Sequence, residues 1–241
     1  MKDVSYSFNS NPELWLNSVF ITIFCISIII MIGFYLPEKY KNIYTKFLGI
    51  LFFTRLIFLH GYMVGLGDWN IVNSLPLHLC GISSLAIIII MFKYNQSLYE
   101  YLVLLGIPSA IHSILTPQFI NGWDGYYFPE FYLSHGAILL APLYLSINFN
   151  YKLRINAWKT SFINGLLLAV IIGMINLFIG YFYGILPNYL YLCNAPIAEN
   201  PLLLTNQWPY YFLMLVFFMF IHIILIFYIY KLLGKVHKSN E

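Results

Sequence analysis

Long apolar stretches, separated by short polar segments, run along the whole chain. A helix needs about 20 apolar residues to cross the hydrocarbon core of a bilayer. Seven stretches approach or exceed this length, and they cover residues 14–36, 46–66, 76–92, 98–115, 131–147, 158–183 and 209–232. The third is the shortest and begins at a proline. The pattern predicts an all-α, polytopic membrane bundle of seven transmembrane helices, built as a single domain over residues 1–241.

Basic residues alternate between the linkers and thereby indicate the orientation of the chain. Lys and Arg follow the first, third, fifth and last stretches: Lys39, Lys41, Lys46, Lys93, Lys152, Arg154, Lys159, Lys231, Lys235 and Lys238. The other linkers contain neither residue type and carry acidic residues instead: Asp68, Asp124, Glu130 and Glu199. Because basic linkers remain in the cytoplasm, we predict a multi-pass protein of the cell membrane with its N-terminus outside and its C-terminus in the cytoplasm.

The composition supports a membrane protein and excludes several other classes. Hydrophobic residues make up 61% of the chain and charged residues only 9%, against roughly 25% charged residues in a soluble protein. The net charge of +3 without a basic stripe predicts no nucleic-acid partner. Three cysteines (Cys25, Cys80 and Cys193) without a C-x-x-C pair are too few for a disulfide framework or a structural zinc site. We therefore expect no metal and no cofactor.

Four of the six histidines lie at one depth, near the outer ends of four different stretches: His60, His78, His112 and His135. An ionisable group inside a membrane segment is energetically costly and usually functional. Their shared depth predicts a common pocket that faces outward, in which His60 and His112 would contact the substrate. His222 lies near the middle of the last stretch and His237 lies in the tail.

Cys80 lies near the start of the third stretch, where the sequence favours a reactive thiol. Ser74 is a good N-cap residue and Pro76 suits a first helical turn. The free N–H groups and the dipole of a helix start can lower the pKa of a nearby thiol. His78 is only two residues away and lies on a different face, so we predict His135, from another stretch, as the base. The alternative is that Cys80 is a small packing residue.

The fourth stretch carries a polar stripe of Ser109, His112, Ser113 and Thr116, whose spacing matches one helix face. Pro108, at the edge of this stripe, is expected to kink the helix. A polar stripe in a membrane helix should face protein or water rather than lipid. It therefore indicates either a wall of the pocket or hydrogen bonds between helices.

Further positions allow expectations about helix packing, ion pairing and substrate contact. Gly136 would let a neighbouring helix or a ligand approach beside His135, and Arg55 would snorkel or pair with Glu100. The last outer linker is aromatic and rich in proline, which predicts either a lid over the pocket or an interfacial aromatic belt. Further candidate substrate contacts are Asn176, Asn188, Tyr189 and Trp208.

Five short motifs together resemble one family over nearly the whole chain. They are Leu75-Pro-Leu-His-Leu-Cys80, Leu115-Thr-Pro117, residues 131–135, Asn188-Tyr-Leu-Tyr191 with Pro196, and Trp208-Pro-Tyr-Tyr211. The chain resembles the YwaF-like bacterial integral membrane proteins, which are similar to eukaryotic transmembrane acyltransferases that act on ether phospholipids through a cysteine. The resemblance implies that Cys80 is the nucleophile. In the eukaryotic branch a histidine is expected directly after the cysteine, whereas here His78 precedes it and Gly81 follows.

These observations favour a membrane-embedded acyltransferase or acyl hydrolase that acts on lipid acyl chains. Cys80, His135 and His78 would be its catalytic residues and membrane lipids its partners. A transporter or receptor-like protein that binds a small solute in the outer pocket is the alternative. Metal binding by the outer histidines is a third reading, although no two of them share a helical i, i+3 or i, i+4 spacing. The sequence contains no indication of the oligomeric state.

Overall fold

A computed structural model describes residues 11–117, 119, 125–197 and 202–237. Three residues of the charge pattern, Asp124, Glu199 and Lys238, lie outside these ranges. Regular structure in the described residues is helical, apart from isolated bridge residues such as the pair Leu153 and Val236. The helices are α1 (Pro12–Tyr35), α2 (Glu38–Leu66), α3 (Leu79–Phe92), α4 (Gln96–Tyr101), the π-helix η2 (Leu102–Gly106), α5 (Ile107–Leu115), α6 (Tyr127–Asn148), α7 (Ala157–Tyr183), the 3-10 turn η3 (Tyr189–Tyr191) and α8 (Tyr210–Leu232).

Every predicted apolar stretch contains a helix, and in the described part of the chain five helical segments are long and apolar enough to span a membrane. These are α1, α2, the continuous segment Gln96–Leu115, α7 and α8. Helix α3 is apolar but has only 14 residues, which at 1.5 Å per residue is shorter than the roughly 30 Å of a bilayer core. The structure therefore establishes a multi-pass helical membrane protein with five candidate spans.

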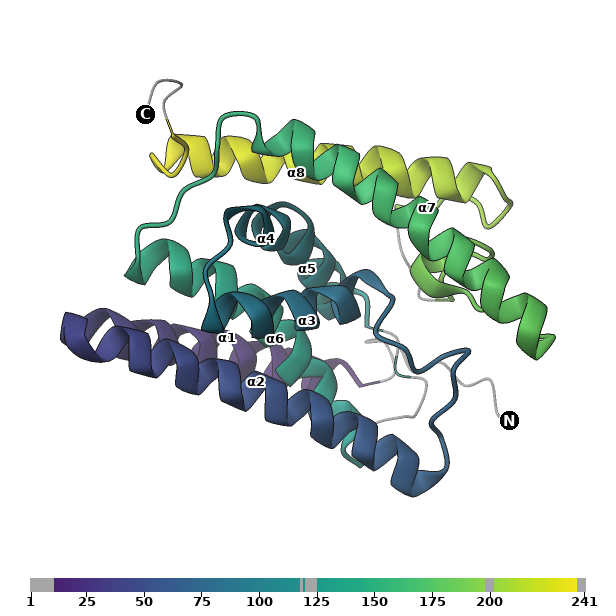
Figure 1. The fold of residues 1–241 in the computed structure, drawn as a ribbon, viewed down its shortest axis with the longest axis horizontal. Coiled ribbons are helices and arrows are strands. Elements are labelled where there is room, and N and C mark those ends of the chain that lie inside the picture. The colour runs from purple at the N-terminus through teal and green to yellow at the C-terminus, as the bar shows by residue number, and fades with distance from the viewer. Residues whose placement is uncertain (1–10, 118, 120–124, 198–201, 238–241) are drawn as a thin grey trace.

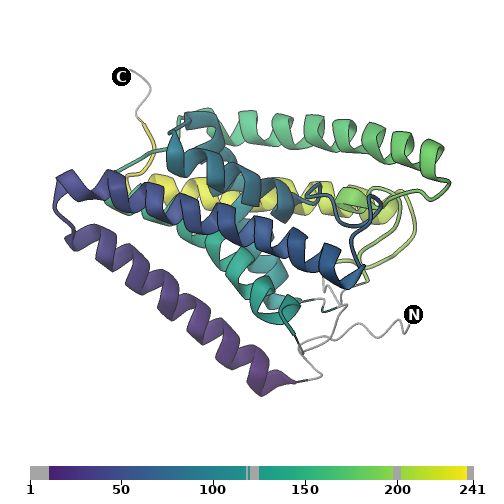
Figure 2. The same ribbon diagram turned by 60° about the horizontal axis from the view of Figure 1, so that its bottom comes forward.

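The segment 96–115 forms the centre of the bundle. In its most apolar window 61% of the residues are buried, against 11% in α1 and in α2. Helices α3 and α6 pack against it, α1 lies along α6, and α2 lies along α3 (Figures 1 and 2). Helices α7 and α8 pack against each other and against η2 on the opposite side. The outer helices thus present broad apolar faces, as a surface in contact with lipid requires.

Pro108 widens the central segment rather than simply kinking it. The five residues immediately before α5 form a π-helix, and Pro108 is the second residue of α5. A proline inside a helix lacks an N–H donor and clashes with the carbonyl four residues earlier. Widening the preceding turn relieves that clash. Because the turn after the π-helix is rotated relative to a regular helix, Pro108 determines where the polar stripe of α5 points.

Helix α3 begins later than the sequence suggests. The N-cap residue is His78, and Ser74 is bonded elsewhere, because its hydroxyl accepts the backbone N–H of Asn70 (3.0 Å). The prediction of Ser74 as the N-cap was therefore wrong. Residues 76–78 lead into the helix and pack on its start, since a Cβ at Gly81 would lie 2.7 Å from the backbone of Pro76. Only glycine fits there, and the close packing makes Cys80 the second residue of the helix.

Two ion pairs join the helices, and neither is the one expected for Arg55. Arg55 pairs with Glu130 of α6, whereas Glu100 pairs with Arg154. The prediction that Arg55 snorkels or pairs with Glu100 was wrong because α2 begins at Glu38, well before the expected residue 46. Arg55 consequently lies farther from the N-terminal end of its helix, beside Glu130.

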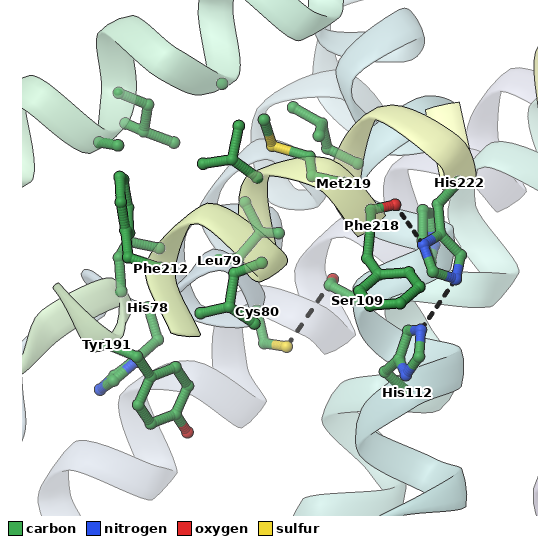
Figure 3. A pocket seen from close by; sticks show the side chains of 18 of the residues that line it. His78, Leu79, Cys80, Ser109, His112, Tyr191, Phe212, Phe218, Met219 and His222 are labelled. Carbon is green, nitrogen blue, oxygen red and sulfur yellow. Dashed lines mark hydrogen bonds between the residues drawn. The ribbon is translucent and has the colours of Figure 1, made fainter. Parts of the chain in front are cut away.

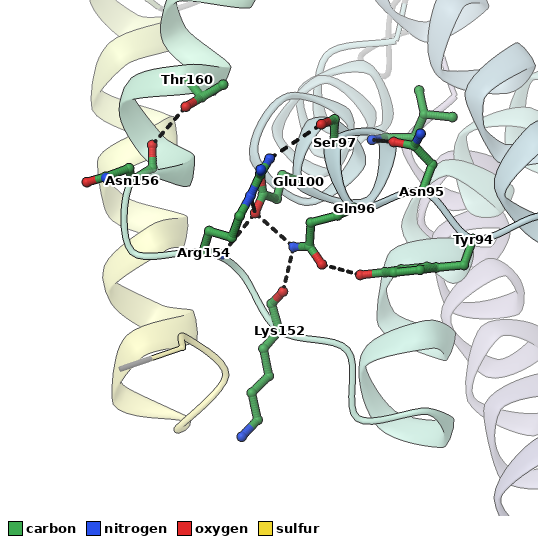
Figure 4. A network of polar contacts seen from close by, with 10 residues as sticks. Tyr94, Asn95, Gln96, Ser97, Glu100, Lys152, Arg154, Asn156 and Thr160 are labelled. Carbon is green, nitrogen blue, oxygen red and sulfur yellow. Dashed lines mark hydrogen bonds and ion pairs between the residues drawn. The ribbon is translucent and has the colours of Figure 1, made fainter. Parts of the chain in front are cut away.

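Glu100 is the centre of a polar network that fixes the linker before α7 to the start of α4 (Figure 4). Its carboxylate is 2% exposed and accepts hydrogen bonds from the Arg154 backbone N–H (2.9 Å), the Arg154 guanidinium (2.7 Å at Nη2) and Gln96 Nε2 (2.8 Å). Gln96 Nε2 also donates to the Lys152 carbonyl (2.9 Å). This network satisfies a buried charge at the end of the central segment.

Removing the guanidinium should destabilise the bundle. Arg154→Ala leaves the buried Glu100 carboxylate without its cation, and such a loss costs on the order of 3 kcal/mol. Lys152→Ala is the matched control, because Lys152 contributes only its backbone carbonyl and its side chain points away from the network. Thermal unfolding of the purified protein in detergent should show a clearly lower melting temperature for Arg154→Ala and an almost unchanged one for Lys152→Ala. Equal melting temperatures for both variants would contradict the role assigned to this pair.

Candidate functional site

A cavity of about 320 Å³ lies between α3, α5, α7, α8 and the segment at 190–192 (Figure 3). Its volume is at the lower end of the range of small-molecule pockets. Most of its lining is aliphatic or aromatic. The polar side chains that line it are His78, Cys80, Ser109, His112, Ser113 and His222, together with the phenol of Tyr191. Three of the five residues expected to share a pocket, His78, Cys80 and His112, thus line one cavity.

The Cys80 thiol is held by two serines of the polar stripe. Its sulfur lies 3.5 Å from Ser113 Oγ and 3.8 Å from Ser109 Oγ. The Ser109 hydroxyl donates to the Gly106 carbonyl (2.8 Å) at the end of the π-helix, so towards the sulfur it is an acceptor. The Ser113 hydroxyl remains able to donate to the sulfur. A thiolate at Cys80 would therefore receive a hydrogen bond from Ser113.

His135, on α6, contacts the same thiol, and its surroundings define which ring nitrogen carries the proton. The Cys80 and His135 side chains interact by hydrogen bonding and charge. His135 Nδ1 lies 2.6 Å from the Phe131 carbonyl, which can only accept, so Nδ1 carries the proton. This leaves the Nε2 lone pair to receive a proton from the thiol. His135 is 9% exposed and is not among the residues that line the cavity.

A buried ion pair lies next to His135. Glu130 is 4% exposed, pairs with Arg55, accepts the Tyr126 hydroxyl (3.1 Å) and acts electrostatically on His135. A carboxylate near an imidazole favours the charged imidazolium. On the other side of α6, a Cβ at Gly136 would lie 2.9 Å from Thr22 Cγ2 of α1, so Gly136 allows the close helix approach that was expected beside His135.

A second pair of histidines lies elsewhere in the same cavity. His112 Nε2 and His222 Nε2 are 2.9 Å apart, and His222 Nδ1 lies 2.5 Å from the Phe218 carbonyl (Figure 3). His222 came from the middle of the last apolar stretch, and its sequence position alone gave no reason to place it with His112. Burial of polar groups without partners is costly, so two histidines on adjacent membrane helices gain by bonding to each other.

His78 lines the cavity beside an aromatic pair rather than beside the thiol. Its ring lies 5.0 Å from that of Tyr191 and 5.5 Å from that of Tyr189, measured between centroids. Its Nδ1 is buried without a partner in the described residues. The thiol of Cys80 is directed toward Ser109, away from this ring (Figure 3). The catalytic role predicted for His78 stays a prediction.

Tyr191 is a cavity residue that the sequence analysis did not single out. Burial raises the pKa of its phenol to about 12, and the nearby Cys80 acts in the same direction. Tyr191 therefore keeps its O–H at neutral pH, as a donor close to the thiol. Leu190 and Tyr191 have positive φ values of 57° and 54°, which non-glycine residues rarely adopt. No sequence pattern reveals such a turn around a non-glycine residue.

The other predicted substrate contacts lie outside the cavity lining. Asn176 Nδ2 donates to the Tyr189 carbonyl (3.0 Å), and the Tyr189 hydroxyl bonds Ile71 and Leu75 ahead of α3. Asn188 Oδ1 accepts the backbone N–H groups of residues 193 and 194. These three side chains thus organise the loops that surround the site.

The remaining two candidates lie near the surface. His60 Nδ1 accepts a hydrogen bond from Trp69 Nε1 (3.1 Å), in an exposed position. Trp208 is 65% exposed. Neither side chain lines the cavity. In the described part of the chain, no group of three or more His, Cys, Asp or Glu residues could hold a metal ion.

One comparison with known proteins gives a match. Residues 6–228 match the model of the TMEM164 family. No curated protein and no solved structure matched the chain. The matched range contains all the polar residues that line the cavity, together with His135.

The geometry predicts that Cys80 is the reactive thiol and that its reactivity depends on His135. A small, membrane-permeant alkylating reagent at pH 7.5 should label Cys80 markedly more slowly in His135→Ala, because the thiol then lacks the base that takes its proton and the thiolate is the reactive form. Cys193 is the internal control, because burial raises the pKa of this linker cysteine and it has no histidine partner in the described residues. Peptide mass spectrometry measures both rates in one sample. If His135→Ala slows both cysteines equally, or neither, the pairing with His135 is disproved.

Proposed function

Because the chain belongs to the TMEM164 family of transmembrane proteins, we propose that it is a membrane-embedded acyltransferase that transfers lipid acyl chains through Cys80. The observation that carries the proposal is a thiol that lines an apolar cavity and contacts a histidine with a free Nε2. The resemblance to YwaF-like proteins, and through them to cysteine-dependent ether-phospholipid acyltransferases, supports the same chemistry. With water as the acceptor, the same site would act as an acyl hydrolase.

The first half-reaction transfers the acyl group to the sulfur. His135 Nε2 takes the Sγ proton, and the thiolate attacks the ester carbonyl carbon of the donor lipid. The C–S bond forms, and the π electrons of the carbonyl move onto its oxygen. The ester C–O bond then breaks, and the alcohol leaves with the proton that His135 held. The products are a thioester on Cys80 and a lysolipid.

Several donors are available to the oxyanion of this step. The first intrahelical bond of α3 runs from Ile82 N to the His78 carbonyl, so the N–H groups of Cys80 and Gly81 make no intrahelical bond. The Ser113 hydroxyl and the protonated Tyr191 phenol lie on the cavity side. Donors that are fixed in an apolar site stabilise a developing charge without reorganisation.

The second half-reaction releases the acyl group to an acceptor. The hydroxyl oxygen of a second lipid attacks the thioester carbonyl, the C–S bond breaks, and the proton of the hydroxyl finally returns to the sulfur. The apolar lining of the cavity admits the chain and restricts water. This favours transfer over hydrolysis.

The alternative, binding and passage of a small solute, needs polar groups that are free to meet the solute. The polar groups deeper in the bundle are bonded to one another, since Arg55 pairs with Glu130 and His222 with His112. The lining of the cavity is mostly apolar. Both features suit a lipid chain better than a hydrated solute.

The proposed protein crosses the cell membrane seven times, with its N-terminus outside. In this proposal two further helices also cross the membrane, in addition to the five candidate spans. They are α3, together with the residues that lead into it, and α6, which has 22 residues. This count agrees with the alternation of basic and acidic linkers. Cys80, at the outer end of α3, would then act in the outer leaflet.

Acyl transfer by the purified protein tests the proposed activity. In proteoliposomes that contain a phospholipid donor and a labelled lysophospholipid, the wild-type protein should form labelled diacyl product. Cys80→Ala should lose about 10³-fold in rate, because the nucleophile is absent. Cys25→Ala and Cys193→Ala, which alter the other cysteines, should retain the activity. Product formation that survives in Cys80→Ala would refute the proposal, and a labelled free fatty acid as the main product would identify a hydrolase.

Accessibility labelling tests the orientation. The experiment introduces a single cysteine at Asp124 or at Lys152, in a chain whose three native cysteines are replaced by serine. The two cysteines should differ in their labelling in whole cells. The proposed topology predicts that an impermeant maleimide labels the first and not the second, and that permeabilisation exposes the second. The reversed pattern would place the cavity in the inner leaflet.

A further inference from the structure

The His112–His222 pair has no part in the first half-reaction, yet it lines the cavity that holds the thiol. The Phe218 carbonyl can only accept, so His222 Nδ1 carries a proton and, in the neutral ring, His222 Nε2 is an acceptor. The hydrogen bond of 2.9 Å between the rings must therefore come from His112 Nε2–H. The remaining nitrogen of His112, Nδ1, is left with a lone pair.

This lone pair is available for chemistry. Nδ1 of His112 makes no hydrogen bond within the described part of the chain, and it is not among the buried polar atoms that lack a partner there. The atom is therefore accessible, in a ring that lines the cavity. His112 directly precedes Ser113, whose hydroxyl lies 3.5 Å from the Cys80 sulfur. His112 and Ser113 both line the cavity that contains the Cys80 thiol.

His135 is placed differently. It contacts the sulfur but is not among the residues that line the cavity, whereas His112 is. In the proposed first half-reaction, the proton that His135 took from the sulfur goes to the departing alcohol. An incoming acceptor would enter the cavity that His112 lines. The two half-reactions therefore have different histidines available to them.

From this we infer that His112 is the base that activates the acceptor hydroxyl, and that His222 is its positioning residue. This inference rests on the proposed acyltransferase function and adds that the acceptor is a lipid alcohol. His112 Nδ1 takes the hydroxyl proton while the oxygen forms its bond to the thioester carbon and the C–S bond breaks. The proton then passes from His112 to the thiolate, which restores the thiol. No other reactant is needed.

His222 supports this step in two ways. Its Nε2 lone pair holds His112 in the tautomer that leaves Nδ1 unprotonated. Once Nδ1 has taken the proton, the imidazolium of His112 still donates Nε2–H to His222, which stabilises the charge. The Phe218 carbonyl fixes His222 in turn. The arrangement is that of a general base, His112, whose ring is oriented by a further group, His222.

The experiment separates the two half-reactions in the full-length protein. A long-chain p-nitrophenyl ester serves as acyl donor and lysophosphatidylcholine as acceptor, in mixed micelles. Intact-protein mass spectrometry follows the acyl adduct on Cys80, and product analysis follows transfer. In His112→Phe the adduct should still form, but transfer from it should slow by about 10²-fold, the typical contribution of a general base. The adduct should therefore accumulate.

Matched variants control for other causes. His135→Ala should form almost no adduct, so it fails in the first half-reaction, whereas His112→Phe should fail in the second. His222→Phe should slow transfer less than His112→Phe, because His112 remains but its tautomer is no longer fixed. His237→Phe, in the C-terminal tail, should behave as the wild type. Adduct formation in His112→Phe also reports that the variant has folded.

The possible results are distinguishable. An adduct that forms in His112→Phe and is transferred at the wild-type rate would assign both half-reactions to His135 and overturn this inference alone. The absence of any Cys80 adduct in the wild-type protein would instead overturn the proposed function. Accumulation of the adduct in His112→Phe, with wild-type behaviour of His237→Phe, supports the inference.

Discussion

A polar group in the interior of a membrane bundle has no water to bond, so it must find its partner within the protein. This constraint explains most of the polar contacts in the structure. Arg55 meets Glu130, Arg154 meets Glu100, and His112 meets His222. Each pair joins segments that are distant in the sequence. The thiol of Cys80 follows the same rule, with two serines and a histidine around it.

The same constraint defines the chemistry of the site. Each histidine that faces the reaction has one ring nitrogen bonded to a group of known donor or acceptor character. For His135 this group is the Phe131 carbonyl, and for His112 it is His222, which the Phe218 carbonyl fixes. Backbone carbonyls four residues earlier in a helix thereby determine which nitrogens are basic. The polar pairs that stabilise the bundle also orient the lone pairs on which the proposed catalysis depends.

Much of this could be predicted from the sequence, because a membrane leaves few choices. The presence of a helix in each apolar stretch follows from apolar length, although α2 begins earlier and α3 later than predicted. The prediction that His135 serves Cys80 rested on depth and on the unsuitable spacing of His78. Contacts that depend on helix rotation could not be predicted. The π-helix before Pro108 turns Ser109 and Ser113 toward the thiol, and nothing in a single sequence gives that rotation. The same holds for the partner of Arg55 and for the place of His222.

Features of the loops were the hardest to predict. Asn188 and Tyr189 belong to a motif that suggested substrate contact, but their side chains bond the backbone of the surrounding loops. A conformation with two consecutive positive φ values at Leu190 and Tyr191 brings Tyr191 into the cavity instead. Hydrogen bonds from side chains to the backbone of distant segments leave no periodic signal in a sequence.

The central claim is that Cys80 becomes covalently acylated with the help of His135. Rapid-quench peptide mass spectrometry of the wild-type protein, mixed with a phospholipid donor and no acceptor, tests it most directly. The account predicts an acyl mass on the peptide that contains Cys80, removable by neutral hydroxylamine as a thioester is, and strongly reduced in His135→Ala. An acyl group found on another residue, or product formed with Cys80 unmodified at every time point, would contradict it.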